Sequence, residues 1–221
     1  MRKINLITKN HKKTKRNYIE RMNDKKIECM KVAKKYSKSY WDGPRKFGYG
    51  GFKYIPGRLE DIAKYLENRF LNQKKKTKIL DIGCGKGFLL YEFFKLNKNI
   101  ELHGIDISKY AISNSKAEIK NRLKVFDARS RLPFKSNFFD LVISINTLHN
   151  FNLMENLKAL KEIKRVGKNA YIAVESYRSN SELFNLQCWA LTCDSFFSPK
   201  EWEYLFKSTK INGEYEFIYF D

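Results

Sequence analysis

The sequence predicts an α/β fold in which helices cover both faces of a doubly wound, mostly parallel sheet. Two observations carry this prediction. From residue 58 onward, short apolar runs alternate with longer segments whose apolar residues recur at helical spacing. The run over 139–145 is almost continuously apolar, which is typical of a parallel strand buried on both faces. With 221 residues, the chain has the length of one domain that carries an appendage.

The expected elements follow one another in a regular order. Strands are expected over residues 79–82, 100–106, 122–127, 139–145, 170–174 and 214–220. Helices are expected over residues 58–70, 88–96, 109–121 and 153–166. A further helix begins at Ser198, because Pro199 suits the first helical position and Glu201 completes a capping box. Residues 179–197 fit a helix or a strand, so the closing topology stays open.

Two segments precede the main domain, which we expect over residues 58–221. Residues 1–39 form a basic N-terminal extension, polar and mobile over 1–17 and weakly helical over 18–36. Residues 40–57 hold five glycines, two prolines and six aromatic residues. A flexible, aromatic segment just before a domain core indicates a lid or a substrate loop. A packed connector is the alternative.

The net charge of +20 first suggests nucleic acid or an anionic membrane surface as a partner. Of this charge, +11 lies in residues 1–39, which hold 14 basic and 3 acidic side chains. Lysines outnumber arginines by 33 to 11, whereas phosphate-binding sites favour the arginine fork. A solvated surface set by overall composition and a nucleic-acid footprint therefore remain as alternatives.

The sequence gives no sign of secretion or of membrane insertion. Its start is basic but lacks an apolar segment with a cleavage site, and no stretch approaches ~18 consecutive apolar residues. The cysteines form no CxxC pair, so free buried thiols in a reducing cytosol are expected. They are Cys29, Cys84, Cys188 and Cys193. We therefore expect a cytoplasmic protein without a membrane partner.

Small and acidic residues gather where three successive strands end. The first strand runs into Asp81-Ile82-Gly83-Cys84-Gly85-Lys86-Gly87, whose glycines let a ligand approach the backbone closely. The following helix presents free N–H groups and the positive end of its dipole. Asp106 ends the second strand, 19 residues after Gly87, and its carboxylate can accept hydrogen bonds from both hydroxyls of a ribose. Asp127 ends the third strand.

Two kinds of cofactor fit a glycine loop followed by an acidic residue about 20 positions on. A dinucleotide fingerprint needs a third glycine at the position of Phe88. The arrangement instead resembles the class I S-adenosylmethionine-dependent methyltransferases. ILDIGCGKG is similar to their first motif, GIDIS to their second and FDLVISINTLHN to their fourth, over roughly residues 75–175. The resemblance implies a Rossmann-like fold and S-adenosyl-L-methionine as cofactor, with S-adenosyl-L-homocysteine as product.

The resemblance assigns one group of residues to the methionine part of the cofactor. Gly83, Cys84 and Gly85 would contact it through their backbone atoms. Asp81 would order the loop or meet the amino group. The floor near the sulfonium would be formed by Ile145 and Asn146.

A second group of residues is assigned to the adenosine part. Asp106 would hold the ribose, and Ile107 would pack on the adenine ring. Asp127 would accept a hydrogen bond from the adenine amino group, with the Ala128 N–H beside it.

The acceptor side offers candidate bases and a candidate clamp. A hydroxyl acceptor usually needs a general base, whereas a neutral amine can react without one. His149 and Glu175 are the candidate bases, with a structural imidazole and a salt-bridge partner as the respective alternatives. Tyr177 and Arg178 lie at the same edge of the sheet, where Arg178 would clamp an anionic acceptor or only pair with a carboxylate.

Aromatic residues of the segment 40–57 complete the predicted acceptor site. Trp41, Tyr49 and Phe52 would stack on a sugar or a nucleotide. The alternative is that these rings pack against the core of the protein itself. The flanking segments are similar to small bacterial methyltransferases of surface-saccharide or secondary-metabolite pathways.

Absent motifs narrow the reaction. The fourth motif reads SINTLHN, not the Asn/Asp-Pro-Pro-Tyr/Phe of enzymes that methylate exocyclic amines. No cysteine follows the fourth strand, and no Asp/Asp/Asn set indicates a metal. The predicted function is methyl transfer to an oxygen or nitrogen atom of a small molecule, such as a saccharide or nucleotide sugar. The alternatives are an RNA methyltransferase with a basic N-terminal arm, then a protein methyltransferase, then a non-catalytic scaffold.

Overall fold

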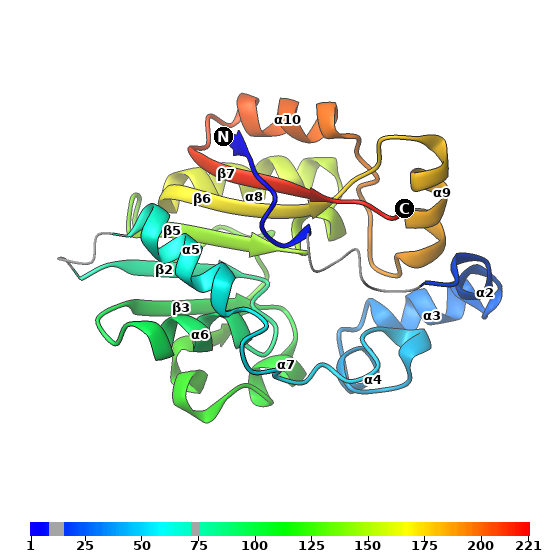
Figure 1. Ribbon diagram of the computed structural model, residues 1–221, viewed down its shortest axis with the longest axis horizontal. Helices are drawn as coiled ribbons and strands as arrows, with labels where there is room; N and C mark the ends of the chain where they lie inside the picture. Colours follow the sequence, from blue (N-terminus) through cyan, green and yellow to red (C-terminus); the bar gives the residue numbers. More distant parts are fainter. Residues whose placement is uncertain (9–15, 72–75) are drawn as a thin grey trace.

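The fold is built on one seven-stranded sheet in which every pair of neighbouring strands is parallel (Figure 1). The computed structural model describes residues 1–8, 16–71 and 76–221. The strand order is β1-β7-β6-β5-β2-β3-β4. The strands are β1 (Arg2–Lys3), β2 (Lys78–Ile82), β3 (Glu101–Asp106), β4 (Leu123–Val125), β5 (Phe139–Ile145), β6 (Gly167–Glu175) and β7 (Gly213–Ile218). The predicted doubly wound α/β class, with a Rossmann-like sheet, is thereby confirmed.

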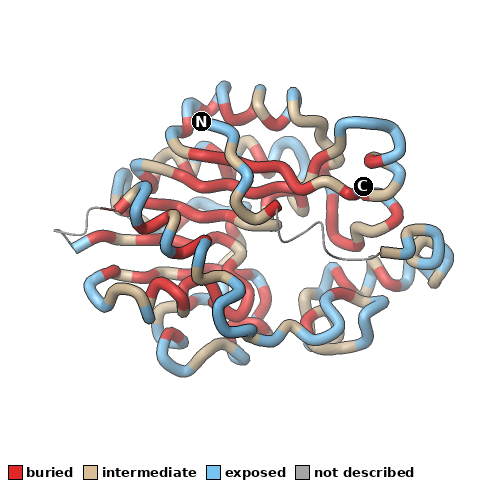
Figure 2. The backbone as a smooth tube through the Cα atoms, in the orientation of Figure 1, coloured by how far each residue is buried: buried red, intermediate tan, exposed pale blue. Residues whose placement is uncertain are grey.

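The central strands are buried on both faces (Figure 2). Side chains alternate between the two faces along a strand, so neighbouring residues enter different cores. Ile79 and Leu141 pack into one core, whereas Leu80 and Val142 pack into the core on the opposite face. All four side chains are at most 1% exposed. This double burial is the reason that the strand over 139–145 is almost continuously apolar.

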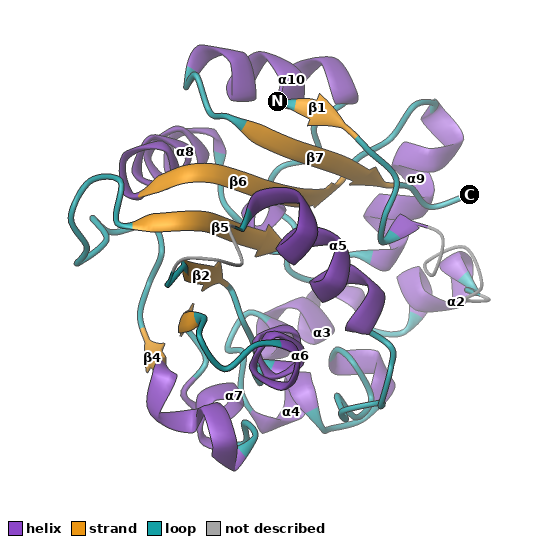
Figure 3. Ribbon diagram, turned by 60° about the vertical axis from the view of Figure 1, so that its left-hand side comes forward, coloured by secondary structure: helices purple, strands orange, loops and turns teal. Residues whose placement is uncertain are grey.

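Helices cover both faces of the sheet. Residues of α8 and α10 form one core with the sheet, and residues of α5 and α6 form the other (Figure 3). The capping box at the start of α10 is present, because the Glu201 carboxylate accepts a hydrogen bond from the Ser198 N–H at 2.7 Å. The helices on the two faces are α5 (Glu60–Phe70), α6 (Phe88–Leu96), α7 (Lys109–Ser113), α8 (Leu153–Val166) and α10 (Pro199–Ser208).

Two elements are shorter than the sequence predicts. The helix expected over 109–121 ends at Ser113, and a 3-10 helix, η2, follows over Ala117–Arg122. The Ser115 hydroxyl donates to the Ile112 carbonyl at 2.8 Å, which is the side-chain competition that ends helices near serine. The third strand covers three residues rather than 122–127, because β4 is the edge of the sheet and pairs only with β3.

The N-terminus forms part of the sheet. Arg2 and Lys3 form β1, which pairs in parallel with β7 as an edge strand. Beyond it, the buried Glu216 carboxylate accepts hydrogen bonds from the N–H groups of Leu6, Ile7 and Thr8 at 2.9–3.1 Å. The prediction of a mobile segment is therefore wrong for residues 1–8, while residues 9–15 lie outside the described residues.

The segment around residues 179–197, left open by the sequence, contains the helix α9 (Asn180–Trp189). The one strand after residue 198, β7, runs parallel to β6. All four cysteines are free thiols and buried. Within the parts of the chain that the structure describes, no helix is both long and apolar enough to cross a lipid bilayer.

The N-terminal helices lie beyond the carboxyl ends of the strands, together with α9 (Figure 1). They are α2 (Tyr18–Asn23), α3 (Lys26–Ala33) and α4 (Lys38–Trp41), followed by the 3-10 helix η1 (Arg45–Phe47). Ligands of open α/β sheets bind at this edge, near the point where the strand order reverses. In this sheet that point lies between β2 and β5, and the N-terminal helices are positioned above it.

Candidate functional site

Two positions in the loop between β2 and α6 require glycine. Gly83 and Gly85 have φ angles of +74° and +56°, in the left-handed region that side chains disfavour. A Cβ atom at Gly83 would lie 1.9 Å from the Thr147 hydroxyl oxygen. A Cβ atom at Gly85 would lie 2.8 Å from the Trp41 ring. The loop is thus held in close contact with two other segments, and its backbone lines one side of a cavity.

Asp106 fixes the shape of this loop from the next strand. Its carboxylate accepts hydrogen bonds from the Gly85 N–H at 2.8 Å and from the Ser108 N–H at 2.7 Å. Burial raises the pKa of Asp106, and these two hydrogen bonds oppose the rise. Each carboxylate oxygen still has lone pairs for a ligand, so the side chain can order the loop and accept from ribose hydroxyls at once.

Asp81 is a second buried carboxylate at the same place. It is 5% exposed and accepts no hydrogen bond from the described part of the chain. Burial, and then the neighbouring Asp106, raise the pKa of Asp81 to about 7. A buried carboxylate without a partner is costly unless a cation or hydrogen-bond donor approaches it. The two acids therefore fit a ligand that brings a positive charge, and an ammonium group meets that need.

The end of the third strand carries an ion pair. The Asp127 carboxylate accepts from the Arg129 guanidinium at 2.7–3.1 Å and from the Arg129 N–H at 3.0 Å. These contacts with Arg129 lower the pKa of Asp127. Arg129 also approaches Glu155 at 3.4 Å. The sequence predicts Asp127 as an adenine acceptor but does not reveal that Arg129 already binds both of its oxygens.

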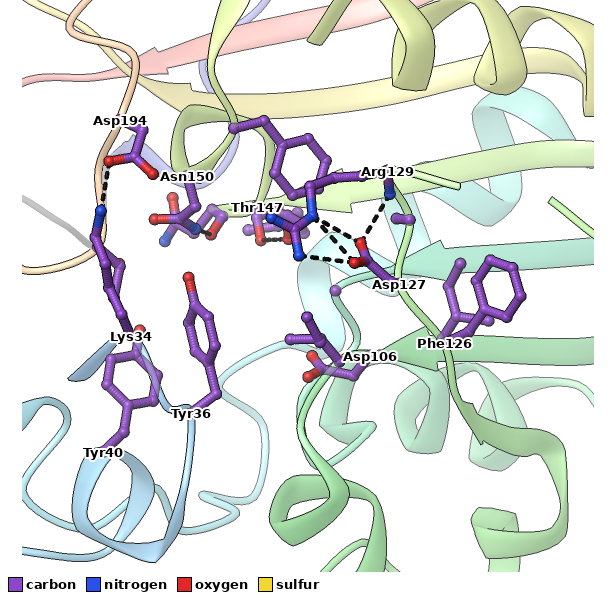
Figure 4. A pocket seen from close by; sticks show the side chains of 18 of the residues that line it. Lys34, Tyr36, Tyr40, Asp106, Phe126, Asp127, Arg129, Thr147, Asn150 and Asp194 are labelled. Atoms are coloured by element: carbon purple, nitrogen blue, oxygen red, sulfur yellow. Dashed lines mark hydrogen bonds and ion pairs between the residues drawn. The ribbon is translucent and has the colours of Figure 1, made fainter. Parts of the chain in front are cut away.

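These loops enclose a cavity of about 200 Å³ (Figure 4). A single water needs about 10–15 Å³ by this measure, so the cavity holds far more than ordered solvent. Nine predicted site residues line it: Trp41, Tyr49, Gly83, Asp106, Ile107, Asp127, Ala128, Ile145 and Asn146. Ile107 is 43% exposed and presents an apolar side chain to the cavity, which suits the face of an adenine ring.

The remaining predicted residues lie elsewhere. Asp81, Cys84 and Gly85 belong to the glycine loop but do not line the cavity. Phe52 stacks on Phe88 at 5.2 Å between ring centroids, behind the cavity wall. Tyr177 lies outside the lining, as does Arg178, which pairs with Glu182 and, at 2.8 Å, with Asp221.

The two predicted bases contact each other but not the cavity. His149 Nδ1 accepts a hydrogen bond from the Glu175 N–H at 3.2 Å, and Nε2 lies 3.6 Å from the Glu175 carboxylate. His149 is 4% exposed, and burial lowers its pKa. Its carbonyl accepts from the N–H groups of Asp194 and Ser195 at 2.9 Å. In this arrangement His149 anchors the loop after α9, and its role as a base stays a prediction.

Residues 36–54, which we call the aromatic lid, line one side of the cavity through Tyr36, Tyr40, Trp41 and Tyr49. The lid or substrate-loop role expected for residues 40–57 stays a prediction. Trp41 stacks on Tyr49 at 5.3 Å between ring centroids and packs over Gly85. Its indole N–H donates to the Ser108 hydroxyl at 2.9 Å. Ser108 in turn caps α7 and donates to Asp106. The lid is thus linked through Ser108 to Asp106, the predicted ribose-binding acid.

A buried ion pair holds the aromatic lid to the glycine loop. Lys86, which follows Gly85, donates to both oxygens of Asp42 at 2.7 and 2.8 Å and to the Phe52 carbonyl at 2.8 Å. The Tyr110 hydroxyl also donates to Asp42, at 2.8 Å. All three ammonium protons of Lys86 are used, and its side chain is 7% exposed. We call Asp42, Lys86 and Tyr110 the lid clasp.

The far side of the cavity is made by residues that the sequence analysis missed. They come from the N-terminal helices, from the turn after β5 and from the loop after α9. Lys34 of this wall donates to Asp194 at 2.6 Å (Figure 4). The missed lining residues include Lys34, Tyr36, Tyr40, Arg129, Thr147, Asn150, Phe151, Thr192 and Asp194. The aromatic run containing Tyr36 and Tyr40 was a usable signal, whereas nothing local marks Asp194.

Fold and site together define a class of protein. A parallel α/β sheet, a glycine loop at the point of strand reversal and an acid at the end of the next strand occur together in class I S-adenosylmethionine-dependent methyltransferases. The family model described as a methyltransferase domain matches residues 73–210, more than half of the chain. The chain belongs to this family, whose cofactor is S-adenosyl-L-methionine.

The relatives agree on the domain but not on an acceptor. An uncharacterized protein of Methanocaldococcus jannaschii is 41% identical over 111 residues, which cover 50% of this chain and 44% of that protein. A human protein named probable tRNA methyltransferase 9B is 33% identical over 98 residues, 42% of this chain and 20% of its own. The chain thus spans less than half the length of these two relatives.

A solved structure shares the fold. The S-adenosylmethionine-dependent methyltransferase from Archaeoglobus fulgidus superposes with a TM-score of 0.51 over 68% of each chain. The two sequences are 21% identical, so this likeness concerns the arrangement of the sheet and its helices.

Proposed function

We propose that the protein transfers a methyl group from S-adenosyl-L-methionine to an oxygen or nitrogen atom of a small molecule, a saccharide being the chemistry we expect. The observation that carries this proposal is the position of the N-terminal helices. Lys34 and Tyr36 form one wall of the cavity, so the acceptor must fit beneath the lid. A concave, partly aromatic pocket suits a small ring better than a polymer.

The cofactor side of the cavity is assigned as the sequence analysis proposes. Asp106 would accept from the ribose hydroxyls, Ile107 would pack on adenine, and the backbone of Gly83 would adjoin the methionine part. The bound cofactor supplies an activated methyl group on a sulfonium. The chain then has to position the acceptor in line with that methyl group and to exclude water, which is the larger part of the catalysis of a displacement. Trp41 and the lid clasp supply the exclusion of water.

The alternative acceptor is RNA, recognised by the basic N-terminal extension. Against it, three basic residues of this extension already have internal partners. Lys26 donates to the carbonyls of Cys188 and Ala190 at 2.7 and 2.5 Å, and Arg21 donates to the Arg45 carbonyl at 2.9 Å. Lys34 is paired with Asp194. Lys26 and Arg21 thereby stabilise the packing of α2 and α3 on α9, and Asp194 offsets the charge of the exposed Lys34.

The experiment that separates these proposals follows the methyl group. The protein is incubated with methyl-labelled cofactor and a cell extract split into small-molecule, RNA and protein fractions. We expect label in the small-molecule fraction. Label recovered mainly in RNA would refute the proposed acceptor class, and label in no fraction would refute methyl transfer under these conditions.

A charge-reversal variant provides the matched control. Lys31 and Lys35 are exposed, and their ammonium groups make no hydrogen bond or ion pair within residues 1–8, 16–71 and 76–221. Lys31→Glu combined with Lys35→Glu should leave methylation of the small-molecule fraction within two-fold of the wild type. An RNA enzyme with a basic arm should instead lose most of its activity, because binding to RNA depends on phosphate neutralisation.

A further inference from the structure

The charged residues that line the cavity restrict which small acceptors can bind there. Two cationic side chains line the cavity among the described residues, and both are bound to carboxylates. Lys34 pairs with Asp194, and Arg129 pairs with Asp127 and Glu155. A phosphorylated or carboxylated acceptor would therefore meet a carboxylate beside each of these cations, and the repulsion disfavours it.

A cationic acceptor is disfavoured by the same pattern. Asp106 and Asp127 lie on the side assigned to adenosine, and Asp194, across the cavity, already bonds Lys34. An aliphatic amine is an ammonium ion at pH 7, since its pKa is near ~10. On the side opposite the adenosine, such an acceptor would meet Asp194, a carboxylate that is already paired with a cation. The remaining class is an uncharged acceptor. Among uncharged nucleophiles, a hydroxyl group is the one that usually needs a general base.

Tyr36 projects a hydroxyl group into the cavity (Figure 4). Its φ angle is +46°, a left-handed conformation that costs a tyrosine free energy. The conformation is held because the Tyr36 carbonyl accepts from the Ser108 hydroxyl at 2.5 Å and from the Trp41 indole at 3.2 Å. The left-handed backbone of Tyr36 therefore directs its side chain into the cavity. Ser108, which holds this backbone, also donates its N–H to Asp106.

Asn150 and Asp194 face Tyr36 across the cavity (Figure 4). The Asn150 amide nitrogen donates to the Asn146 carbonyl at 3.2 Å, while its amide oxygen is buried without a hydrogen-bond partner. A hydroxyl donor in the cavity would relieve that unsatisfied oxygen. Asp194 bonds Lys34 through Oδ1, and its second oxygen lies on the side of Asn150.

We infer that Tyr36, Asn150 and the Lys34–Asp194 pair form an acceptor subsite for an uncharged, hydroxyl-bearing molecule, with Asp194 as the base. This inference rests on the proposed function and narrows its acceptor. The hydroxyl oxygen forms a bond to the methyl carbon, and the carbon–sulfur bond breaks with its electron pair left on sulfur as a thioether. The hydroxyl proton moves to the Asp194 carboxylate. Lys34 orients that carboxylate through the ion pair at 2.6 Å.

The first arm of the test reads the charge of the product. Labelled small molecules from the extract reaction are passed over a cation exchanger and an anion exchanger. We expect the label of the methylated product to flow through both, whereas unreacted cofactor, a sulfonium cation, stays on the cation exchanger. Label retained on the anion exchanger would overturn this inference and leave the small-molecule function standing, whereas label in RNA would overturn both.

The second arm uses Tyr36→Phe, with Tyr204→Phe as control. Tyr204 lies on α10, is 71% exposed and is not part of the cavity lining, so the loss of its hydroxyl should not affect the subsite. Tyr36→Phe removes one hydrogen bond and should raise the half-saturating extract concentration about 10-fold. Affinity for S-adenosylhomocysteine should stay within two-fold. Wild-type behaviour, or a loss of that affinity, would contradict the assignment.

The third arm uses Asp194→Asn, with the surface variant Asp24→Asn as control. Loss of a general base should lower kcat about 100-fold or more, with the half-saturating extract concentration little changed. Unchanged kcat in Asp194→Asn would refute its role as base, provided that S-adenosylhomocysteine still binds and shows the variant to be folded.

Discussion

Asp81 shows how one residue couples folding to ligand binding. Its pKa of about 7 in the folded chain lies above the value of about 4 expected for an unfolded chain. A carboxyl group with a raised pKa contributes stability that is fully present below the unfolded pKa and is lost as pH rises through the folded pKa. The ligand-free protein should therefore lose stability between pH 5 and pH 8 through this group.

Asp81→Asn should change stability and cofactor binding in opposite directions. At pH 8 the variant should melt at a higher temperature than the wild type without ligand, because an unpaired buried charge has been removed. Its affinity for S-adenosylhomocysteine should fall, because the ammonium group of the ligand loses its carboxylate. Thermal melts with and without ligand at pH 5 and pH 8 measure both effects. A lower melting temperature together with unchanged affinity would rule out this account of Asp81.

Gly83 offers a steric test with a built-in comparison. Gly83→Ala brings a Cβ atom to 1.9 Å from the Thr147 hydroxyl oxygen at φ +74°, whereas Gly51→Ala meets open space at φ +109°. Both variants suffer the backbone strain of a positive φ, about 1 kcal/mol. Only Gly83→Ala should also displace the loop and weaken S-adenosylhomocysteine binding at least 10-fold by calorimetry. Equal affinities for the two variants would contradict the close approach.

Single residues were predictable where a local motif fixed their place. Gly83, Asp106, Ile107 and Asp127 were found because the order of the strands brings the ends of successive motifs to one edge. Asp194 could not be found, because its position depends on the backbone of a loop anchored by His149, which no local pattern reveals. The prediction of His149 marked the right region, although the structure places its imidazole outside the cavity.

At the scale of elements, the lid clasp holds the aromatic lid, which precedes the main domain, against the glycine loop. Although burial opposes it, hydrogen bonds from Lys86, Tyr110 and the Phe52 N–H hold the pKa of Asp42 below its ordinary value. The Asp42 carboxyl group thus stays ionised around neutral pH. The lid is therefore bound to the glycine loop itself. A change in that loop on cofactor binding would also move the lid.

Lys86→Met should release the lid and leave Asp42 without its cation. Removing one partner of a well-buried pair costs ~3–5 kcal/mol, and the partial exposure of Asp42 reduces that figure to about 2 kcal/mol. For a chain of this size we expect the melting temperature to fall by roughly 4–8 °C. Proteolysis within residues 42–57 should speed up. The double variant Asp42→Asn with Lys86→Met should regain part of the stability, and failure to do so would argue against the clasp.

The N-terminal strand is the second element that determines stability. The Glu216 carboxylate accepts from three backbone N–H groups, from the Thr8 hydroxyl at 2.7 Å and from the Tyr171 hydroxyl. A chain that lacks residues 1–8 loses all of these donors except Tyr171 and leaves a buried charge. We expect its melting temperature to fall by more than 5 °C, with partial recovery on Glu216→Gln. An unchanged melting temperature would show that β1 is dispensable.

Most elements could be predicted because their signals are local. The capping box at Ser198 and the apolar run of β5 each lie within one short window. The strand β1 could not be predicted, because its two residues pair with a strand more than 200 positions away. The same holds for the parallel direction of β7, which depends on how the chain returns after α10.

At the scale of the whole molecule, the charge of the N-terminal extension has a structural use. Arg16 and Arg21 stack on Trp189 at 5.4 and 5.2 Å from the ring centroid, and Lys26 donates to the carbonyls at the end of α9. Cations are favoured at the carboxyl end of a helix. Some of these basic side chains thus hold in place the helices beside the cavity, and the others are spread over the surface.

The account rests on S-adenosylmethionine binding in the cavity between the glycine loop, Asp106 and the aromatic lid. Calorimetric titration of S-adenosylhomocysteine into the wild-type protein and into Asp106→Ala tests this most directly. We predict one site in the wild type and an affinity at least 50-fold lower in Asp106→Ala, because the variant loses the ribose acceptor and the order of the loop. No binding to the wild type, or equal affinities for the two proteins, would contradict the account.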